Sequence, residues 1–214
     1  MANSGSLARP VPAGYTGLPG ENMARATWFC VDIECSGPVP GLYDMISLGA
    51  VVVTPHADRF DIGDTFYVEI KPTAPRVDAG AMAVNGLDYD RLKQEGADLA
   101  DALTTLTAWT RDRVLPGSEP VFVGHNAPFD WSFVSWAYHA TGLPNPFGYK
   151  ALDTKALAMG VLGLHWFDSN KERLDELLKL PPVERDKVHR ADYDAWYQAH
   201  ILVQLLERIE NFAS

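Results

Sequence analysis

The sequence predicts a single α/β domain in which a mixed β-sheet is flanked by α-helices. Three apolar, β-branched or aromatic runs follow one another at 27–35, 45–53 and 65–70, with Gly, Pro and Asp between them. From about residue 99 onward, helical spacing alternates with short strand-like runs. A chain of 214 residues, 47% of them hydrophobic, is long enough to bury the core of one such domain.

The first three runs are predicted to form an antiparallel meander, because each is typical of a strand and turn residues separate them. The run at 27–35 has apolar residues on both sides of its acids, which is typical of a central strand. We therefore expect this strand to have a neighbour on each side.

The second half of the chain is predicted to alternate helices with short strands. Apolar residues of 99–109 recur at helical spacing, and PVFVGH at 120–125 follows as a short buried strand. Asn126 is expected to cap the next helix, which has Pro128 in its first turn and runs to about Ala140. The remaining elements are a strand at 150–153 and helices from Thr154, at 171–180 and at 191–212.

The N-terminal segment differs in composition from the rest. Residues 1–22 are rich in Gly, Pro, Ala and Ser without periodicity, and Met23 precedes the first strand. We expect 1–22 to be a disordered leader or a tag remnant and 23–214 to be the domain.

The two cysteines predict a reduced protein. Cys30 and Cys35 lie on one predicted strand, about 16 Å apart and on opposite faces, so they cannot pair with each other. No apolar run reaches the ~18 residues of a membrane span, and no signal-peptide pattern is seen. These features predict a cytoplasmic protein without membrane contact.

Four acids and one histidine stand out in apolar or helical surroundings. Asp32 and Glu34 are two apart on a strand and project from one face. Asp130 lies in a first helical turn, where the helix dipole stabilises a carboxylate. His189 precedes the last helix, and Asp194 lies near its start. Buried carboxylates need a compensating cation, and a histidine exchanges protons near neutral pH, so the set predicts metal-assisted phosphodiester cleavage.

Each of these segments also has a plainer interpretation. An acid pair on a strand is typical of a solvated strand face. An aspartate in the first turn of a helix is typical of a helix terminus, and a lone histidine is typical of the protein surface. The conjunction of all three favours a joint site. Asp192 is one residue out of phase and is expected to point elsewhere, and His125 is expected to make only a local hydrogen bond.

The three segments resemble the exonuclease motifs of the DEDDh family, the exonucleases of ribonuclease H-like fold that include bacterial proofreading subunits, oligoribonuclease and ribonuclease T. The matching segments are WFCVDIECSG, VGHNAPFD and HRADYDA, the last with H-x-x-x-x-D spacing. The similarity runs from about Thr27 to the last helix. FVGHNAPFD followed by NPFGYKALDTKALA is most similar to ribonuclease T.

The resemblance implies a 3′-to-5′ exonuclease that removes nucleoside 5′-monophosphates from the 3′ ends of single-stranded RNA or DNA. Asp32, Glu34, Asp130 and Asp194 would hold two Mg²⁺ or Mn²⁺ ions, which prefer oxygen ligands. His189 would be the general base. A homodimer is also implied, as ribonuclease T-like enzymes are dimeric.

Base stacking is where the chain departs from the ribonuclease T pattern. Pro38 and Val84 stand where those enzymes have aromatic residues. Phe129, Phe147 and Tyr149 remain as candidates to stack on the terminal bases, with core packing as the alternative for Phe129.

Two rival functions fit part of the sequence. The chain could be a proofreading-type or assembly module within a larger nucleic-acid complex, although the intact motifs argue against a degenerate site. A hydrolase using Cys35 or Ser36 with a histidine would leave the four acids unexplained, and neither residue sits on a recognisable nucleophile turn.

The net charge predicts modest affinity for nucleic acid, because polyanions are usually bound by basic surfaces. The formal charge is −10, and two divalent cations would add +4 and leave −6. Binding is therefore expected to depend on a local patch.

Overall fold

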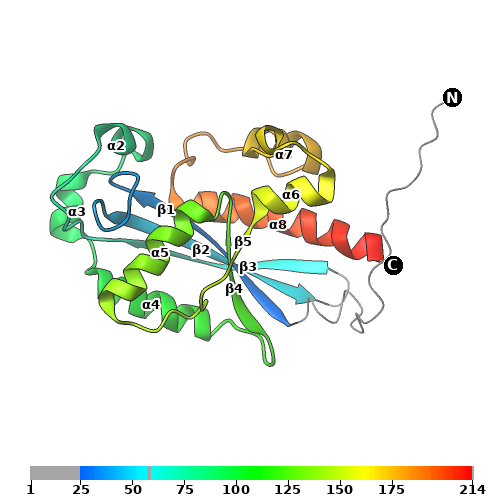
Figure 1. The fold of residues 1–214 in the computed structure, drawn as a ribbon, viewed down its shortest axis with the longest axis horizontal. Coiled ribbons are helices and arrows are strands. Elements are labelled where there is room, and N and C mark those ends of the chain that lie inside the picture. Colours follow the sequence, from blue (N-terminus) through cyan, green and yellow to red (C-terminus); the bar gives the residue numbers. More distant parts are fainter. Residues whose placement is uncertain (1–24, 57–58, 214) are drawn as a thin grey trace.

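A five-stranded sheet in the order β3-β2-β1-β4-β5 forms the centre of the molecule (Figure 1). The structure is a computed structural model, and it describes residues 25–56 and 59–213. The leader predicted at residues 1–22 lies outside the described residues.

The sheet is mixed, as predicted. Strands β1 (Ala26–Cys35), β2 (Met45–His56) and β3 (Arg59–Glu69) form the antiparallel meander. Strands β4 (Glu119–Gly124) and β5 (Ala151–Asp153) continue the sheet in parallel on the other side of β1. The strand that carries the acid pair is therefore central, with a neighbour on each side.

Seven α-helices and one short 3₁₀ helix, Trp166–Asp168, accompany the sheet in the described part of the chain. Two of them, α2 and α3, are short and were not predicted from the sequence. The α-helices are α2 (Ala79–Asn85), α3 (Tyr89–Glu95), α4 (Leu99–Arg111), α5 (Pro128–Thr141), α6 (Thr154–Leu162), α7 (Lys171–Leu178) and α8 (Ala191–Ala213). No helix within the described ranges is both long and apolar enough to cross a bilayer.

The predicted cap of α5 is wrong. Ala127 takes the N-cap position, whereas Asn126 adopts a left-handed conformation with φ 67°. The backbone N–H of Asn126 donates instead to Asp153 Oδ1 at 2.9 Å. Asp153 also caps α6, where it accepts the N–H of Lys155, so one carboxylate at the end of β5 anchors the starts of two helices.

The two faces of the sheet are covered by different helices. Alternate residues of β1, such as Phe29 and Val31, pack in the core beneath α4 and α5, whereas Cys30 packs against α8. Cys35 belongs to the α5 side, so the two free cysteines face opposite ways as predicted. Asp32 and Glu34 are in phase with Cys30 and therefore lie on the face that α8 covers.

A glycine allows α8 to begin close to the acid pair. Gly49 of β2 lies opposite Asp32 in the strand register. A Cβ added at Gly49 would overlap the backbone of Ala191 and Asp192 at the start of α8. Only a residue without a side chain permits this approach, which brings the first turn of α8 next to Asp32.

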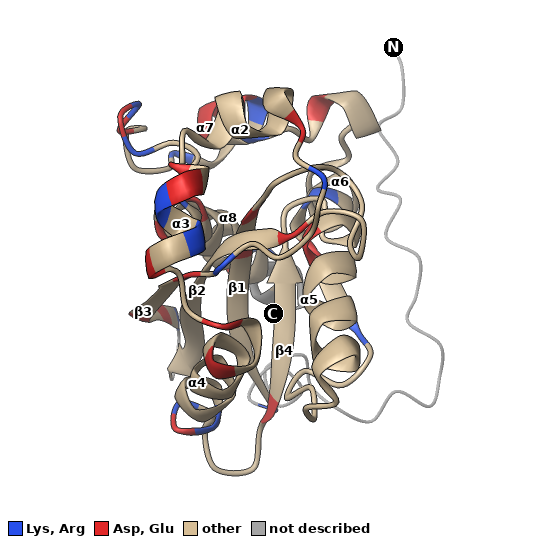
Figure 2. Ribbon diagram, turned by 90° about the vertical axis from the view of Figure 1, so that its left-hand side faces the viewer, with Lys and Arg blue, Asp and Glu red and all other residues tan. Residues whose placement is uncertain are grey.

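Charges of both signs alternate along α3 (Figure 2). Arg91 pairs there with Glu69 at 2.7 Å and with Glu95 at 3.5 Å. Lys93, the other basic residue of this helix, lies 3.4 Å from Asp90, so both basic side chains are partly neutralised by neighbouring acids.

Candidate active site

A cleft of about 340 Å³ lies at the C-terminal end of β1, where the three motifs meet. Its walls come from β1, from the starts of α5, α7 and α8, and from the segments that precede α5 and α8. The structure brings all five predicted acid and histidine positions into this cleft: Asp32, Glu34, Asp130, His189 and Asp194.

The position of the acid pair follows from unequal strand lengths. Strand β4 pairs with β1 only as far as Cys30, opposite Val123, and Asp32 and Glu34 lie beyond that point. Both side chains are partly buried, and that of Asp32 is 16% exposed. The carboxylates thus lie at a sheet edge that a neighbouring strand leaves open.

Asp130 is held against the same strand from the other side. It lies buried in the first turn of α5, and its Oδ1 accepts the backbone N–H of Ile33 at 3.1 Å. Since β4 ends before this point, the carboxylate takes the place of a strand partner for that N–H group. This bond places Asp130 next to both acids of β1.

His189 and Asp194 are joined through the backbone. His189 adopts a left-handed conformation with φ 66°, and its N–H donates to Asp194 Oδ2 at 2.8 Å. The imidazole is exposed, and one of its ring nitrogens lies within 4.8 Å of carboxylate oxygens of Glu34 and Asp194. Asp192 instead pairs with Arg190 at 2.8 Å and does not line the cleft, as its phase on the helix predicted.

The sequence reasoning missed Lys171. Its Nζ donates to Asp194 Oδ1 at 3.0 Å and lies 3.8 Å from Asp32 Oδ1. Lys171 is the first residue of α7, after the N-cap Asn170. The one sequence signal that could have indicated this role was a lysine at a helix N-terminus, where the helix dipole disfavours a cation.

The carboxylates of the cleft hold their protons unusually strongly. Burial raises the pKa of Asp32 to about 7, with Asp194 adding to the effect and Lys171 opposing it. Burial and then the neighbouring acids, Asp32 first among them, raise the pKa of Glu34 to about 9. Burial and the charge of Asp32 also raise the pKa of Asp130 well above its usual range.

The four acids also outnumber Lys171, the one lysine among the residues that line the cleft. A cluster of carboxylate oxygens with too little positive charge around it fits Mg²⁺ or Mn²⁺, which are hard cations with a preference for oxygen. The residues present therefore fit a divalent metal site.

His125 also lines the cleft but takes part in a local contact. Its Nδ1 lies 3.0 Å from Thr154 Oγ1. Burial, together with the charges of Lys171 and Lys155, lowers the pKa of His125 to about 3. The ring therefore stays neutral at physiological pH, and its hydrogen bond joins the end of β4 to the start of α6.

The structure does not bring all three candidate stacking residues together. Phe129 lies on the cleft wall at 36% exposure, with its ring 5.4 Å from that of Phe133. Phe147 is only 5% exposed and packs between core aromatic rings, so the prediction that it stacks on substrate is wrong. Tyr149 is 83% exposed, but it does not line the cleft.

Helix α2 brings Val84 near the first motif. The side-chain amide of Asn85 donates to the carbonyl of Cys35 at 3.2 Å, which ties α2 to the end of β1. Val84 is exposed on this helix. The position that is aromatic in ribonuclease T-like enzymes thus presents an aliphatic side chain here.

Neither Cys35 nor Ser36 is placed to act as the nucleophile of a hydrolase. Burial raises the pKa of the Cys35 thiol to about 11, so the reactive thiolate is scarce at neutral pH. Ser36 is fully buried, and its Oγ accepts the N–H of Asp44 at 2.9 Å. Both side chains belong to the packing and turn structure after β1.

Comparison with known proteins points to one family. The RNase_T family, described as exonuclease, matches residues 29–202. The chain is 37% identical over 181 residues to the 3′-5′ DNA exonuclease Cap18 of Escherichia coli, covering 85% of this chain and 91% of that protein. It is also 28% identical over 186 residues to the PolC-type DNA polymerase III of Bacillus subtilis (strain 168), covering 86% of this chain but only 12% of the polymerase.

Solved structures share the fold at lower identity. The nuclease domain of 3′hExo, a DEDDh family member bound to rAMP, superposes with a TM-score of 0.70 at 16% identity, covering 84% of this chain and 91% of that one. This likeness confirms the ribonuclease H-like arrangement of a mixed sheet between helices.

Proposed function

This chain belongs to the RNase_T family of 3′-to-5′ exonucleases, and on that premise we propose that it removes nucleoside 5′-monophosphates from the 3′ ends of single-stranded DNA. The observation that carries the proposal is the convergence of four carboxylates and one exposed histidine, from three distant segments, on a single cleft. Such a set is suited to hydrolysis of a phosphodiester at the end of a strand.

The proposed metal ligands are Asp32, Glu34, Asp130 and Asp194, and the proposed ions are two Mg²⁺ or Mn²⁺. When bound, such ions stabilise the negative charge on the attacking and leaving oxygens of an in-line displacement. The raised pKa values of three of these acids support the assignment, because the cleft gains from any cation that replaces their protons.

His189 is the proposed general base. Its exposed imidazole can accept a proton from a water molecule in the cleft, and the resulting hydroxide attacks the terminal phosphorus. The bond from phosphorus to the 3′ oxygen of the preceding nucleotide breaks, and that oxygen takes up a proton from the surrounding water. The products are a 3′-hydroxyl on the shortened strand and a free 5′-monophosphate. The bond from the His189 N–H to Asp194 keeps the residue beside the carboxylates.

DNA is the proposed substrate because the relative at 37% identity is named a DNA exonuclease. The neighbour with bound rAMP shares only 16% identity and supports the fold alone. Phe129 is the proposed stacking residue, since its exposed side chain lies on the cleft wall. A base can reach such a ring only when it is unpaired, which favours single strands.

The test is a timed digestion of matched DNA and RNA oligonucleotides, single-stranded or duplex, labelled at either end. With Mg²⁺ or Mn²⁺ we expect the 5′-labelled single-stranded DNA to shorten progressively and the 3′-labelled strand to release a labelled 5′-monophosphate. Asp194→Asn should abolish the reaction, whereas Asp112→Asn, a matched change on the exposed surface, should not. Faster digestion of RNA than of DNA would refute the proposal that DNA is the substrate. Full activity in chelator would refute the proposal that the reaction depends on metal.

The second candidate is a module of a larger nucleic-acid complex. It is favoured by the likeness to the polymerase, of which this chain spans 12%. Activity of the purified chain alone, at a rate unaffected by a polymerase, would argue against it. Sedimentation of the same preparation tests the homodimer that the resemblance to ribonuclease T implies.

A further inference from the structure

We infer that Lys171 is a built-in counter-ion, which occupies the cleft when no metal is bound and leaves the carboxylates when divalent ions bind. The inference rests on the proposed function for the metal site. The inference adds one conformational step, the movement of the Lys171 side chain. This step sets the metal concentration at which the site fills.

The first observation is the position of the ammonium group. Lys171 Nζ lies 3.0 Å from Asp194 Oδ1 and 3.8 Å from Asp32 Oδ1, between two of the four proposed metal ligands. Its side chain is 29% exposed, and it approaches the acids from α7, an element outside the three motifs. A cation in this place competes with any divalent ion for the same two oxygens.

The second observation is that the N-terminal position of Lys171 in α7 does not favour a cation. Lys171 is the first residue of the helix, where the backbone N–H groups and the helix dipole repel positive charge. The attraction that holds the ammonium in place therefore comes from Asp32 and Asp194. When metal neutralises these acids, that attraction is lost and the dipole drives the ammonium away.

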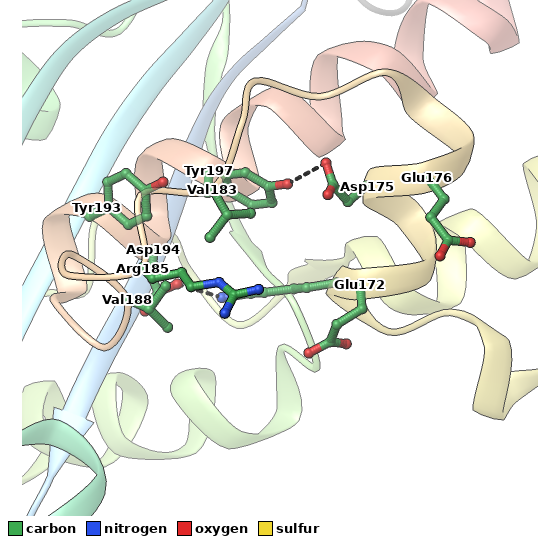
Figure 3. A pocket seen from close by; sticks show the side chains of 10 residues that line it. Glu172, Asp175, Glu176, Val183, Arg185, Val188, Tyr193, Asp194 and Tyr197 are labelled. Carbon is green, nitrogen blue, oxygen red and sulfur yellow. Dashed lines mark hydrogen bonds and ion pairs between the residues drawn. The ribbon is translucent and has the colours of Figure 1, made fainter.

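The third observation is an adjoining space, in which acids outnumber bases, into which the side chain can move. A cavity of about 400 Å³ adjoins the cleft, between α7, α8 and the segment at 183–188 (Figure 3). It shares Lys171, Glu172, Val188 and Asp194 with the cleft. Its other charged residues are Asp175 and Glu176, together with one base, Arg185, and Asp175 accepts a hydrogen bond from the Tyr197 hydroxyl at 2.8 Å. A rotation of the lysine side chain would thus exchange its contacts with Asp32 and Asp194 for contacts with acids of α7.

The direct test measures the reactivity of Lys171 in the wild-type protein. An amine-acylating reagent is applied with and without saturating Mn²⁺, at one pH, and each lysine is quantified by mass spectrometry. We expect acylation of Lys171 to rise several-fold with Mn²⁺, while acylation of Lys155, which lies over the Trp166 ring at 4.4 Å, stays unchanged.

Calorimetry on the same protein separates the possible failures. If Mn²⁺ binds but Lys171 acylation stays the same or falls, the inference is wrong and the proposed metal site stands. If the wild-type protein binds no Mn²⁺ or Mg²⁺, both the inference and the proposed metal site are overturned.

Substitution gives a second readout that does not depend on activity. Lys171→Gln should raise Mn²⁺ affinity about tenfold, which is 1.4 kcal/mol. It should also lower the Tm of the metal-free protein by about 2 to 8 °C, because the acids lose their counter-ion. Lys155→Gln makes the same change in net charge away from the carboxylates. Equal affinity and equal Tm in the two variants would refute the inference.

Discussion

Replacing Asp32 by Asn is expected to stabilise the metal-free protein at pH 8, and to make it less stable than the wild type once Mn²⁺ is added. In the unfolded chain this carboxyl has the ordinary pKa of 3.8, and in the folded protein its pKa is about 7. Between these values the folded state holds a proton that the unfolded state has released. The stability that this proton confers is complete below pH 4 and is lost as the pH rises through 7.

The size of the effect follows from the shift. One pKa unit corresponds to 1.36 kcal/mol, so a rise from 3.8 to about 7 is worth at most about 4 kcal/mol at pH 8. Asn removes this cost but also removes the weaker partner of Lys171, at 3.8 Å, while Asp194 retains its 3.0 Å contact. We therefore expect a gain of about 1 to 4 kcal/mol at pH 8 and almost none at pH 4.

The assay is urea unfolding of the wild type and Asp32→Asn in chelator from pH 4 to 9, repeated at pH 8 with Mn²⁺. Metal should stabilise the wild type by RT ln(1 + [Mn²⁺]/Kd), about 2.7 kcal/mol at a hundred times Kd, and the variant by much less. Asp112→Asn, at an exposed ion pair, should change stability by less than about 0.5 kcal/mol throughout. A variant less stable than the wild type in chelator at pH 8 would show that Asp32 is not under electrostatic stress.

Three further substitutions test other parts of the site. His189→Ala should lower turnover by about 10² to 10⁴-fold at pH 7, with partial recovery at higher pH, while calorimetry shows the Mn²⁺ sites retained; lost sites would make the ring a ligand. Phe129→Ala should lower kcat/KM for single-stranded substrate by about 5- to 150-fold, because stacking is worth roughly 1 to 3 kcal/mol per base. A large fall in thermal stability with kcat/KM intact would instead identify Phe129 as a core residue. Gly49→Ala should cost about 1 to 3 kcal/mol of stability and at least tenfold in kcat/KM, because it pushes the start of α8 away from Asp32. The control is Gly160→Ala, where an added Cβ meets nothing within 4 Å, and equal losses at the two glycines would refute the packing argument.

The outline of the fold and the members of the site could be predicted because their signals are local. Alternation along a strand places Asp32 and Glu34 on one face whatever the rest of the chain does. The spacing of His189 and Asp194 is likewise contained within one short segment. The order of strands and long helices followed from apolar periodicity, whereas α2 and α3 are too short to show a clear period.

What only the tertiary structure decided are contacts between residues far apart in the sequence. The sequence around Phe147 does not show whether this ring is exposed or, as in the structure, buried against Phe29. No local pattern says that Gly49 must face the start of α8, or that the ammonium of Lys171 lies between Asp32 and Asp194. The sequence by itself therefore determined which acids and which histidine are available. The tertiary structure decided how closely they meet and which cation lies among them, because packing distance and charge compensation arise only when distant segments come together.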